Sequence, residues 1–214
     1  MDTSNWTIQA MYTKVITMQA RNLMNHSNLV CAFSFLNLRG YKAWQEHQLF
    51  EELGENLSLK KYMINHQRRL FKEEGGFTNE LIPADLYKMD RMGISRNDKQ
   101  SLVKNLFEKW KGWEEEAKEL YAACVQWCID KQLADSEKFK CLMRDTDKEL
   151  KEIDNHILKL KDLDYSLLEI IMLQDELCEK YSIRKGDKEE EDTLRVLFFF
   201  IPFPNRIFFA KFVL

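Results

Sequence analysis

Two acidic residues, Glu52 and Glu55, lie where a helix would be expected to present apolar side chains. The surrounding segment carries apolar residues three and four positions apart, which places them on one helix face: Leu49, Phe50, Leu53, Leu57 and Leu59. Glu52 falls inside this stripe, and Glu55 lies on its border one turn later. Because a carboxylate in an apolar core costs several kcal/mol unless a positive charge meets it, these two positions require a counter-charge.

Two further acids repeat this pattern later in the chain. Glu114 lies on the broad apolar face of segment 98–131, and Asp147 lies beside the apolar face of segment 135–161. A pair of divalent ions can neutralise several carboxylates at once, so a metal is an economical counter-charge. If such a site exists, Glu52 and Glu114 should face the interior of a helical bundle with their carboxylates close together.

The alternative for each acid is a place at the edge of an apolar stripe, with the stem covered and the carboxylate in water. Glu115 and Glu116 show how easily acidic runs arise on solvated faces, and we expect both to face outward. Composition alone therefore does not decide between a metal site and a set of edge positions.

The elements that must position these residues are helices. Proline and glycine breaks leave five helical stretches, and no alternating apolar segment indicates strands, so the chain is predicted to be all-α: 6–37, 40–72, 98–131, 135–161 and 164–183. The gaps between the first and second stretches and between the third and fourth are short, which predicts two antiparallel hairpins. The long segment 73–97 can run most of the length of a helix, so we expect a four-helix bundle with one long crossover.

Composition excludes some classes of function. Thirty-two Lys and Arg residues against 35 Asp and Glu give a formal charge of -3, which argues against nucleic-acid binding through bulk charge. The N-terminus lacks a charged segment followed by an apolar run, so we expect no signal peptide. The five cysteines form no zinc-type pairs, and Cys124 and Cys128, one helical turn apart, are expected to face the core. These features favour a reducing, cytoplasmic location.

Several segments resemble the ferritin family. FLNLRGYKAWQEHQLFEELGENLSLKKYM resembles the end of the first and the start of the second ferritin helix, LFEKWKGWEEEAKELYAACVQW the third, and EKFKCLMRDTDKELKEI the fourth. The similarity covers residues 8 to 161, and LDYSLLEIIMLQDELCEKYS sits where ferritins carry a short fifth helix. The resemblance implies a ferritin-like domain over 1–183.

Ferritins assemble into hollow shells, oxidise iron(II) at a di-iron site within each bundle and store the ferric mineral inside, so the resemblance implies iron as the metal and a homo-oligomer. Of the family ligands, the second-helix and third-helix glutamates are matched by Glu52 and Glu114. The remaining positions depart from the pattern: Gln19 replaces the first-helix glutamate, Glu55 the second-helix histidine, Asp147 the fourth-helix glutamine, and His26 a nearby first-helix tyrosine. Oxygen donors still suit iron or manganese, and His26 adds a nitrogen ligand if its side chain points inward.

Three hypotheses follow from these departures. The leading one is a divergent ferritin that binds and stores iron with an altered and weakened ferroxidase site, so that any enzymatic activity is Fe(II) oxidation by dioxygen. The second is a catalytically silent ferritin-like shell subunit or interaction protein. The third is an unrelated di-metal enzyme, which is disfavoured because His156 lies too far along the fourth helix to complete a second Glu-x-x-His motif.

The C-terminus lies outside the resemblance. A charged linker, 184–193, precedes a Phe-rich apolar tail, 194–214, in which Pro202 and Pro204 argue against a membrane span. Such a tail suits docking onto a protein partner or onto the protein's own shell, and the alternative is a segment with no selected role.

Overall fold

The computed structural model describes residues 2–68, 94–162 and 164–181, which contain five α-helices and no strand: α1 (Ile8–Phe35), α2 (Arg39–Gln67), α3 (Arg96–Asp130), α4 (Ser136–Asp162) and α5 (Leu167–Tyr181). The all-α prediction is therefore confirmed, with boundaries within a few residues of those expected. Most of the crossover 73–97, the charged linker and the Phe-rich tail lie outside the described residues.

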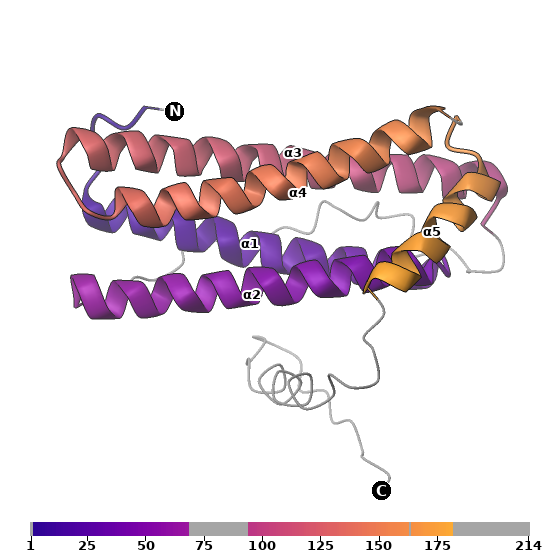
Figure 1. Ribbon diagram of the computed structural model, residues 1–214, viewed down its shortest axis with the longest axis horizontal. Helices are drawn as coiled ribbons and strands as arrows, with labels where there is room; N and C mark the ends of the chain where they lie inside the picture. Colours follow the sequence, from indigo (N-terminus) through magenta and orange to yellow (C-terminus); the bar gives the residue numbers. More distant parts are fainter. Residues whose placement is uncertain (1, 69–93, 163, 182–214) are drawn as a thin grey trace, which may run out of the picture. The chain divides into compact units, whose positions relative to one another are not determined.

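The helices form two antiparallel hairpins, α1–α2 and α3–α4, as the short gaps predicted (Figure 1). Both turns contain a left-handed residue, Asn37 at φ 59° and Gln132 at φ 56°. In each turn a backbone N–H then reaches back to a carbonyl of the last helical turn: Leu38 to Phe33 at 2.9 Å, and Leu133 to Cys128 at 2.8 Å. This arrangement satisfies carbonyls that the helix end leaves free, and it reverses the chain within a few residues.

Side-chain caps fix where two of the helices begin. The hydroxyl of Thr7 accepts a hydrogen bond from the backbone N–H of Ala10, and that of Ser95 accepts one from Asp98, both at 3.1 Å. Each cap satisfies one of the free N–H groups at a helix start. The register of α1 and α3, and hence the direction of their inner side chains, follows from these starting points.

The core consists of two apolar clusters at opposite ends of the bundle. One contains Leu29, Phe33, Tyr41, Phe107 and Trp110, and the other contains Met11, Val15, Leu59, Cys124 and Cys128, together with their neighbours. The burial of both cysteines confirms that they face the core.

A layer of buried polar side chains separates these clusters along three helices. Its members are Gln19, Asn22 and His26 of α1, Gln45, Gln48, Glu52 and Asn56 of α2, and Glu114 of α3. The prediction of a continuous apolar stripe on α2 was partly wrong. Leu57 is 39% exposed, and the middle of the inner face is polar. Since burying polar groups costs free energy, such a layer indicates a function.

Helix α5 crosses the end of the bundle and packs against α2 and α3 (Figure 1). It contributes Ile170, Leu173 and Leu177 to the first apolar cluster. Gly40 allows this close approach, because a Cβ atom there would lie 1.9 Å from the carbonyl oxygen of Gln174. Glycine at position 40 is thus required by the docking of α5.

We expect Gly40→Ala to lower the melting temperature by several degrees. The added carbon meets backbone rather than a flexible side chain, and overpacking of this kind costs about 1–3 kcal/mol, at roughly 2–4 °C per kcal/mol for a chain of this size. Thermal unfolding followed by circular dichroism measures the change. Gly54→Ala is the matched control, because no atom of the described residues lies within 4 Å of its Cβ position; it should be neutral or stabilising by up to about 1 kcal/mol. Equal effects of the two variants would contradict this account.

None of the helices in the described part of the chain is both long and apolar enough to span a membrane.

Candidate metal centre

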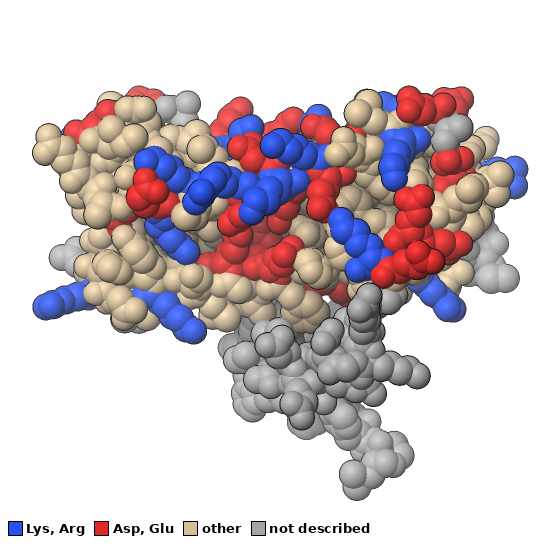
Figure 2. Space-filling view, in the orientation of Figure 1, with Lys and Arg blue, Asp and Glu red and all other residues tan. Residues whose placement is uncertain are grey.

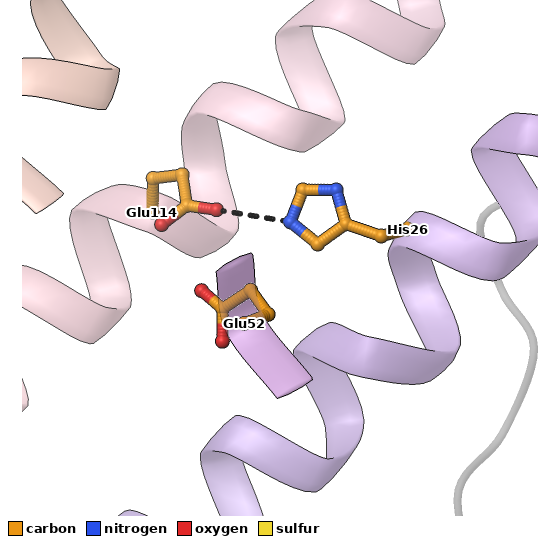
Figure 3. A group of neighbouring side chains, drawn as sticks. All are labelled: His26, Glu52 and Glu114. Atoms are coloured by element: carbon orange, nitrogen blue, oxygen red, sulfur yellow. Dashed lines mark ion pairs between the residues drawn. The ribbon is translucent and has the colours of Figure 1, made fainter. Parts of the chain in front are cut away.

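Three side chains from three helices converge in the middle of the polar layer: His26 of α1, Glu52 of α2 and Glu114 of α3 (Figure 3). A ligand atom from each lies within 4.8 Å of the others, and His26 Nε2 is 3.6 Å from Glu114 Oε1. His26 and Glu114 are fully buried, and Glu52 is 7% exposed. The expectation that Glu52 and Glu114 face inward close together is confirmed, as is the exposure of Glu115 and Glu116.

A hydrogen bond orients the imidazole of His26. Its Nδ1 lies 2.9 Å from the side-chain oxygen Oε1 of Gln45, which can only accept, so Nδ1 carries the proton. In the neutral ring Nε2 then presents a lone pair toward the two carboxylates. Metal-binding histidines are commonly held in this way, with one nitrogen bonded to a neighbouring acceptor and the other free for the ion.

The carboxylate of Glu114 is held from one side only. The indole N–H of Trp113 donates to its Oε1 at 2.8 Å, while its Oε2 has no hydrogen-bond partner within residues 2–68, 94–162 and 164–181. Two aromatic rings, Trp110 and Trp113, also contact His26 edge-on at centroid distances of 5.8 and 5.4 Å. The aromatic side chains therefore limit the freedom of both ligands and keep water away from that side of the site.

Several polar atoms of the layer have no hydrogen-bond partner in the described part of the chain. They include His26 Nε2, Glu52 Oε2, Glu114 Oε2 and Gln48 Oε1. The amide nitrogen Nε2 of Gln45 is also without a described partner and is a donor, but the three oxygens are acceptors, and leaving one buried acceptor without a partner costs about 1–3 kcal/mol. A cation among them would satisfy several at once, so the residues present fit a metal ion.

Gln19, at the family position of the first-helix glutamate, lies in a neighbouring network. Its amide N–H donates to the hydroxyl of Tyr121 at 3.1 Å, and its oxygen accepts from Asn56 at 3.3 Å. Burial and the nearby charges of Glu52 and Glu55 raise the pKa of Tyr121, so this phenol keeps its proton. Both ends of the Gln19 amide are thus occupied by protein partners.

Asp147, at the position of the fourth-helix glutamine, is directed away from the group. Its carboxylate pairs with Lys118 of α3 at 2.6 Å, and its side chain is 36% exposed. The buried position on this turn is the adjacent Thr146. A one-residue step along a helix turns a side chain by about 100°, which explains how the neighbouring residue, rather than Asp147, points inward.

Glu55 lines a groove of about 780 Å³ between α2 and α4, together with Glu149 of α4. Figure 2 shows acidic side chains gathered in the middle of this face. Other acids of the groove are paired, Glu51 with His47 at 3.2 Å and Asp145 with Lys148 at 2.7 Å. Among the described residues, Glu55 and Glu149 have no such ion pair, and both remain available to a cation.

The carboxylates of the centre and of the groove influence one another. Burial, followed by the charge of Glu114, raises the pKa of Glu52 and of Glu149 well above the ordinary range. Burial and the charges of Asp145 and Glu114 raise the pKa of Glu55 to about 7. Without a cation, several of these groups hold protons near neutral pH, and a bound cation would displace those protons.

Sequence reasoning identified Gln19 but missed Glu149, Asn22 of α1 and the buried amides of α2. A signal for them exists in the spacing, because Tyr41, Gln45, Gln48, Glu52 and Asn56 recur three or four residues apart. On α4, Glu149 follows the buried Thr146 by three residues and precedes the buried Ile153 by four. The polar character of these faces hid them from a search for apolar stripes.

His156 has a structural role. It lies in the aromatic part of the core, where its ring stacks on Phe107 at 5.0 Å and its Nε2 lies 3.1 Å from the hydroxyl of Tyr41. Burial lowers its pKa to about 4, so the ring is neutral.

The structure resembles solved ferritins. An open-pore ferritin from the hyperthermophilic archaeon Archaeoglobus fulgidus matches with a TM-score of 0.61 and 14% identity, over 84% of this chain and 100% of that chain. A closed form of the same ferritin, engineered by site-directed mutagenesis, matches with a TM-score of 0.60 and 14% identity, over 84% and 99% of the two chains. No protein-family model and no curated protein matches the sequence.

The fold is therefore that of a ferritin subunit: a four-helix bundle with a short fifth helix. The resemblance found in the sequence is confirmed at the level of the fold.

Proposed function

We propose that this protein is a divergent ferritin subunit that binds iron through His26, Glu52 and Glu114 and stores it. The observation that carries the proposal is the convergence of these buried groups, with free ligand atoms, in a bundle of ferritin fold. One imidazole nitrogen and two carboxylates suit Fe(II), and also Mn(II), better than soft ions that prefer sulfur. Two negative charges balance one divalent ion, which suits a site closed to solvent.

The geometry supports one tightly held cation rather than two. Rapid oxidation by dioxygen at a ferritin di-iron site needs two Fe(II) ions close together, bridged by carboxylate. In this chain Gln19 is bonded to Tyr121 and Asn56, and Asp147 is paired with Lys118, so neither is free to hold a second ion. We therefore propose that ferroxidase activity is weakened, while binding persists.

The groove between α2 and α4 offers a path to the buried ligands. Glu55 and Glu149 lie along it without ion-pairing partners among the described residues, and the charge of Glu114 raises the pKa of both. A cation would meet these two carboxylates first and then the deeper pair. On this proposal Glu55 and Glu149 serve access and weak binding.

Assembly into a ferritin-like shell is part of the proposal. Leu168, Ile171 and Met172 of α5 are 69%, 42% and 57% exposed, and an apolar helix face of this kind favours association. Mass photometry of the purified chain tests it: a large closed particle is expected, and a monomer at micromolar concentration would contradict it.

An anaerobic Fe(II) titration by calorimetry tests the binding itself. We expect one tightly bound ion per chain in the wild type, and loss of that ion in Glu114→Gln. Glu119→Gln is the matched control on the same helix, because Glu119 is exposed, and it should bind normally. A wild type that binds no Fe(II) would leave the alternative function, a silent shell subunit or interaction protein.

A further inference from the structure

A file of aromatic rings leads from the candidate metal centre to the edge of the bundle. His26 contacts Trp110 at a centroid distance of 5.8 Å, Trp110 contacts Trp44 at 4.8 Å, and Trp44 stacks on Tyr181 of α5 at 5.8 Å with an interplanar angle of 7°. Electron transfer slows steeply with distance, so rings in direct contact exchange an electron fastest. The file thus connects a buried ligand to a half-buried phenol by contacts alone.

The two tryptophans have no place to release a proton. Trp110 and Trp44 are 1% and 3% exposed, and the indole N–H of each has no hydrogen-bond acceptor among the residues that the structure describes. An oxidised indole that keeps its proton remains a strongly oxidising cation. If Trp110 or Trp44 is oxidised, we therefore expect it to take an electron from a neighbouring ring rather than to persist as a radical.

Tyr181 differs from both in this respect. Its hydroxyl donates to Oε2 of Glu152 at 2.9 Å, so removal of an electron can be coupled to transfer of the phenolic proton to that carboxylate. Burial and Glu152 raise the pKa of Tyr181, which keeps the phenol protonated at rest. Lys180 shares the same carboxylate oxygen at 3.3 Å and lies 4.7 Å from the ring centre, where its charge opposes oxidation of the ring.

We infer that Trp110, Trp44 and Tyr181 form an electron-transfer chain that supplies a second electron when a peroxide reacts with a single Fe(II) held by His26, Glu52 and Glu114. The inference rests on the proposed function, because iron at the inner end is what meets the oxidant. One Fe(II) gives one electron, and one-electron cleavage of hydrogen peroxide releases a hydroxyl radical. A second electron from the chain lets both oxygens leave as water.

Reduction of the peroxide is coupled to oxidation of both iron and Tyr181. Fe(II), hydrogen peroxide, the Tyr181 phenol and two protons from solvent give Fe(III), two water molecules and a Tyr181 phenoxyl radical, with the phenolic proton on Glu152. The O–O bond breaks, one electron comes from iron, and the other passes from Tyr181 through Trp44 and Trp110. The radical ends on a half-buried residue, where a soluble one-electron reductant such as ascorbate can restore it.

Freeze-quench electron paramagnetic resonance tests the chain. The full-length protein is loaded with one Fe(II) per chain without oxygen and then mixed with hydrogen peroxide. We expect a tyrosyl radical in the wild type, its loss in Tyr181→Phe, and its loss in Trp44→Leu. The matched control is Tyr62→Phe, because Tyr62 is also half-buried but lies near the opposite end of α2, away from the file.

The outcomes separate this inference from the proposed function. If iron binds and consumes peroxide but no tyrosyl radical forms, the electron-transfer chain is overturned and the proposed iron binding stands. A tyrosyl radical that survives in Tyr181→Phe has the same consequence. Failure to bind iron overturns both the proposed function and the electron-transfer chain, because no iron then reacts with peroxide beside Trp110. Circular dichroism on Trp44→Leu and Tyr181→Phe checks that helix content and melting temperature are retained, and Tyr181→Phe keeps the ring that stacks on Trp44.

Discussion

Glu52→Gln should make the metal-free protein more stable at pH 8 and should have little effect at pH 5. Burial and the charge of Glu114 hold the pKa of Glu52 well above its ordinary value of 4.5 in the folded protein. Below that ordinary value both folded and unfolded chains carry the proton, so the group costs nothing. As the pH rises, the unfolded chain releases the proton first, and the folded state loses stability until the pH passes the folded pKa.

The neutral amide of glutamine removes this loss. We expect a gain of about 1–3 kcal/mol at pH 8 for relieving a buried carboxylate, or several degrees at roughly 2–4 °C per kcal/mol. Thermal unfolding of apoprotein at the two pH values measures it, with Glu119→Gln as the exposed control. A variant less stable than the wild type at pH 8 would mean that the carboxylate is stabilised by partners other than a cation.

Fe(II) should stabilise the wild type strongly, and more at pH 8 than at pH 5. A ligand that binds only the folded state adds about 2.7 kcal/mol at one hundred times its dissociation constant, which corresponds to roughly 5–11 °C for a chain of this size. Binding requires ionised carboxylates, and Glu55, with a pKa of about 7, and Glu52 both release protons as the pH rises. Anaerobic melting curves with and without Fe(II) measure the shift.

Glu52→Gln should lose most of this stabilisation, so that its order of stability with the wild type reverses when iron is added. The reversal separates a metal ligand from a buried acid of purely structural origin, because a structural acid would show no dependence on iron. Equal shifts in the two proteins would place the iron elsewhere.

Much of the fold could be predicted from the chain because local signals agree with one another. The short gaps around Gly40 and Lys131 predicted the antiparallel hairpins. The buried face of α3 around Glu114 was predicted correctly because apolar residues surround it. The buried face of α2 was harder to predict, because it carries Gln45 and Gln48. An apolar search therefore moved the stripe toward Leu57, which the structure exposes.

The candidate site could be predicted in part. Glu52 and Glu114 were identified from their apolar surroundings, and His26 from its place in the ferritin resemblance. The inward direction of His26 depends on a hydrogen bond to Gln45 on another helix, which spacing within α1 does not reveal. Asp147 illustrates the opposite difficulty, because its pairing with Lys118 depends on the rotation of α4 against α3. The roles considered for the Phe-rich tail, 194–214, concern residues outside the described part of the chain.

Pulsed electron paramagnetic resonance of the Mn(II)-loaded protein tests the central claim most directly, because it detects nitrogen atoms bound to the ion. If one buried cation is held by His26, Glu52 and Glu114, the wild type should show coupling to a single imidazole nitrogen. His26→Gln should lose that coupling, and His66→Gln, which changes an exposed histidine, should keep it. A Mn(II) site with no nitrogen coupling, or with coupling that persists in His26→Gln, would contradict the account.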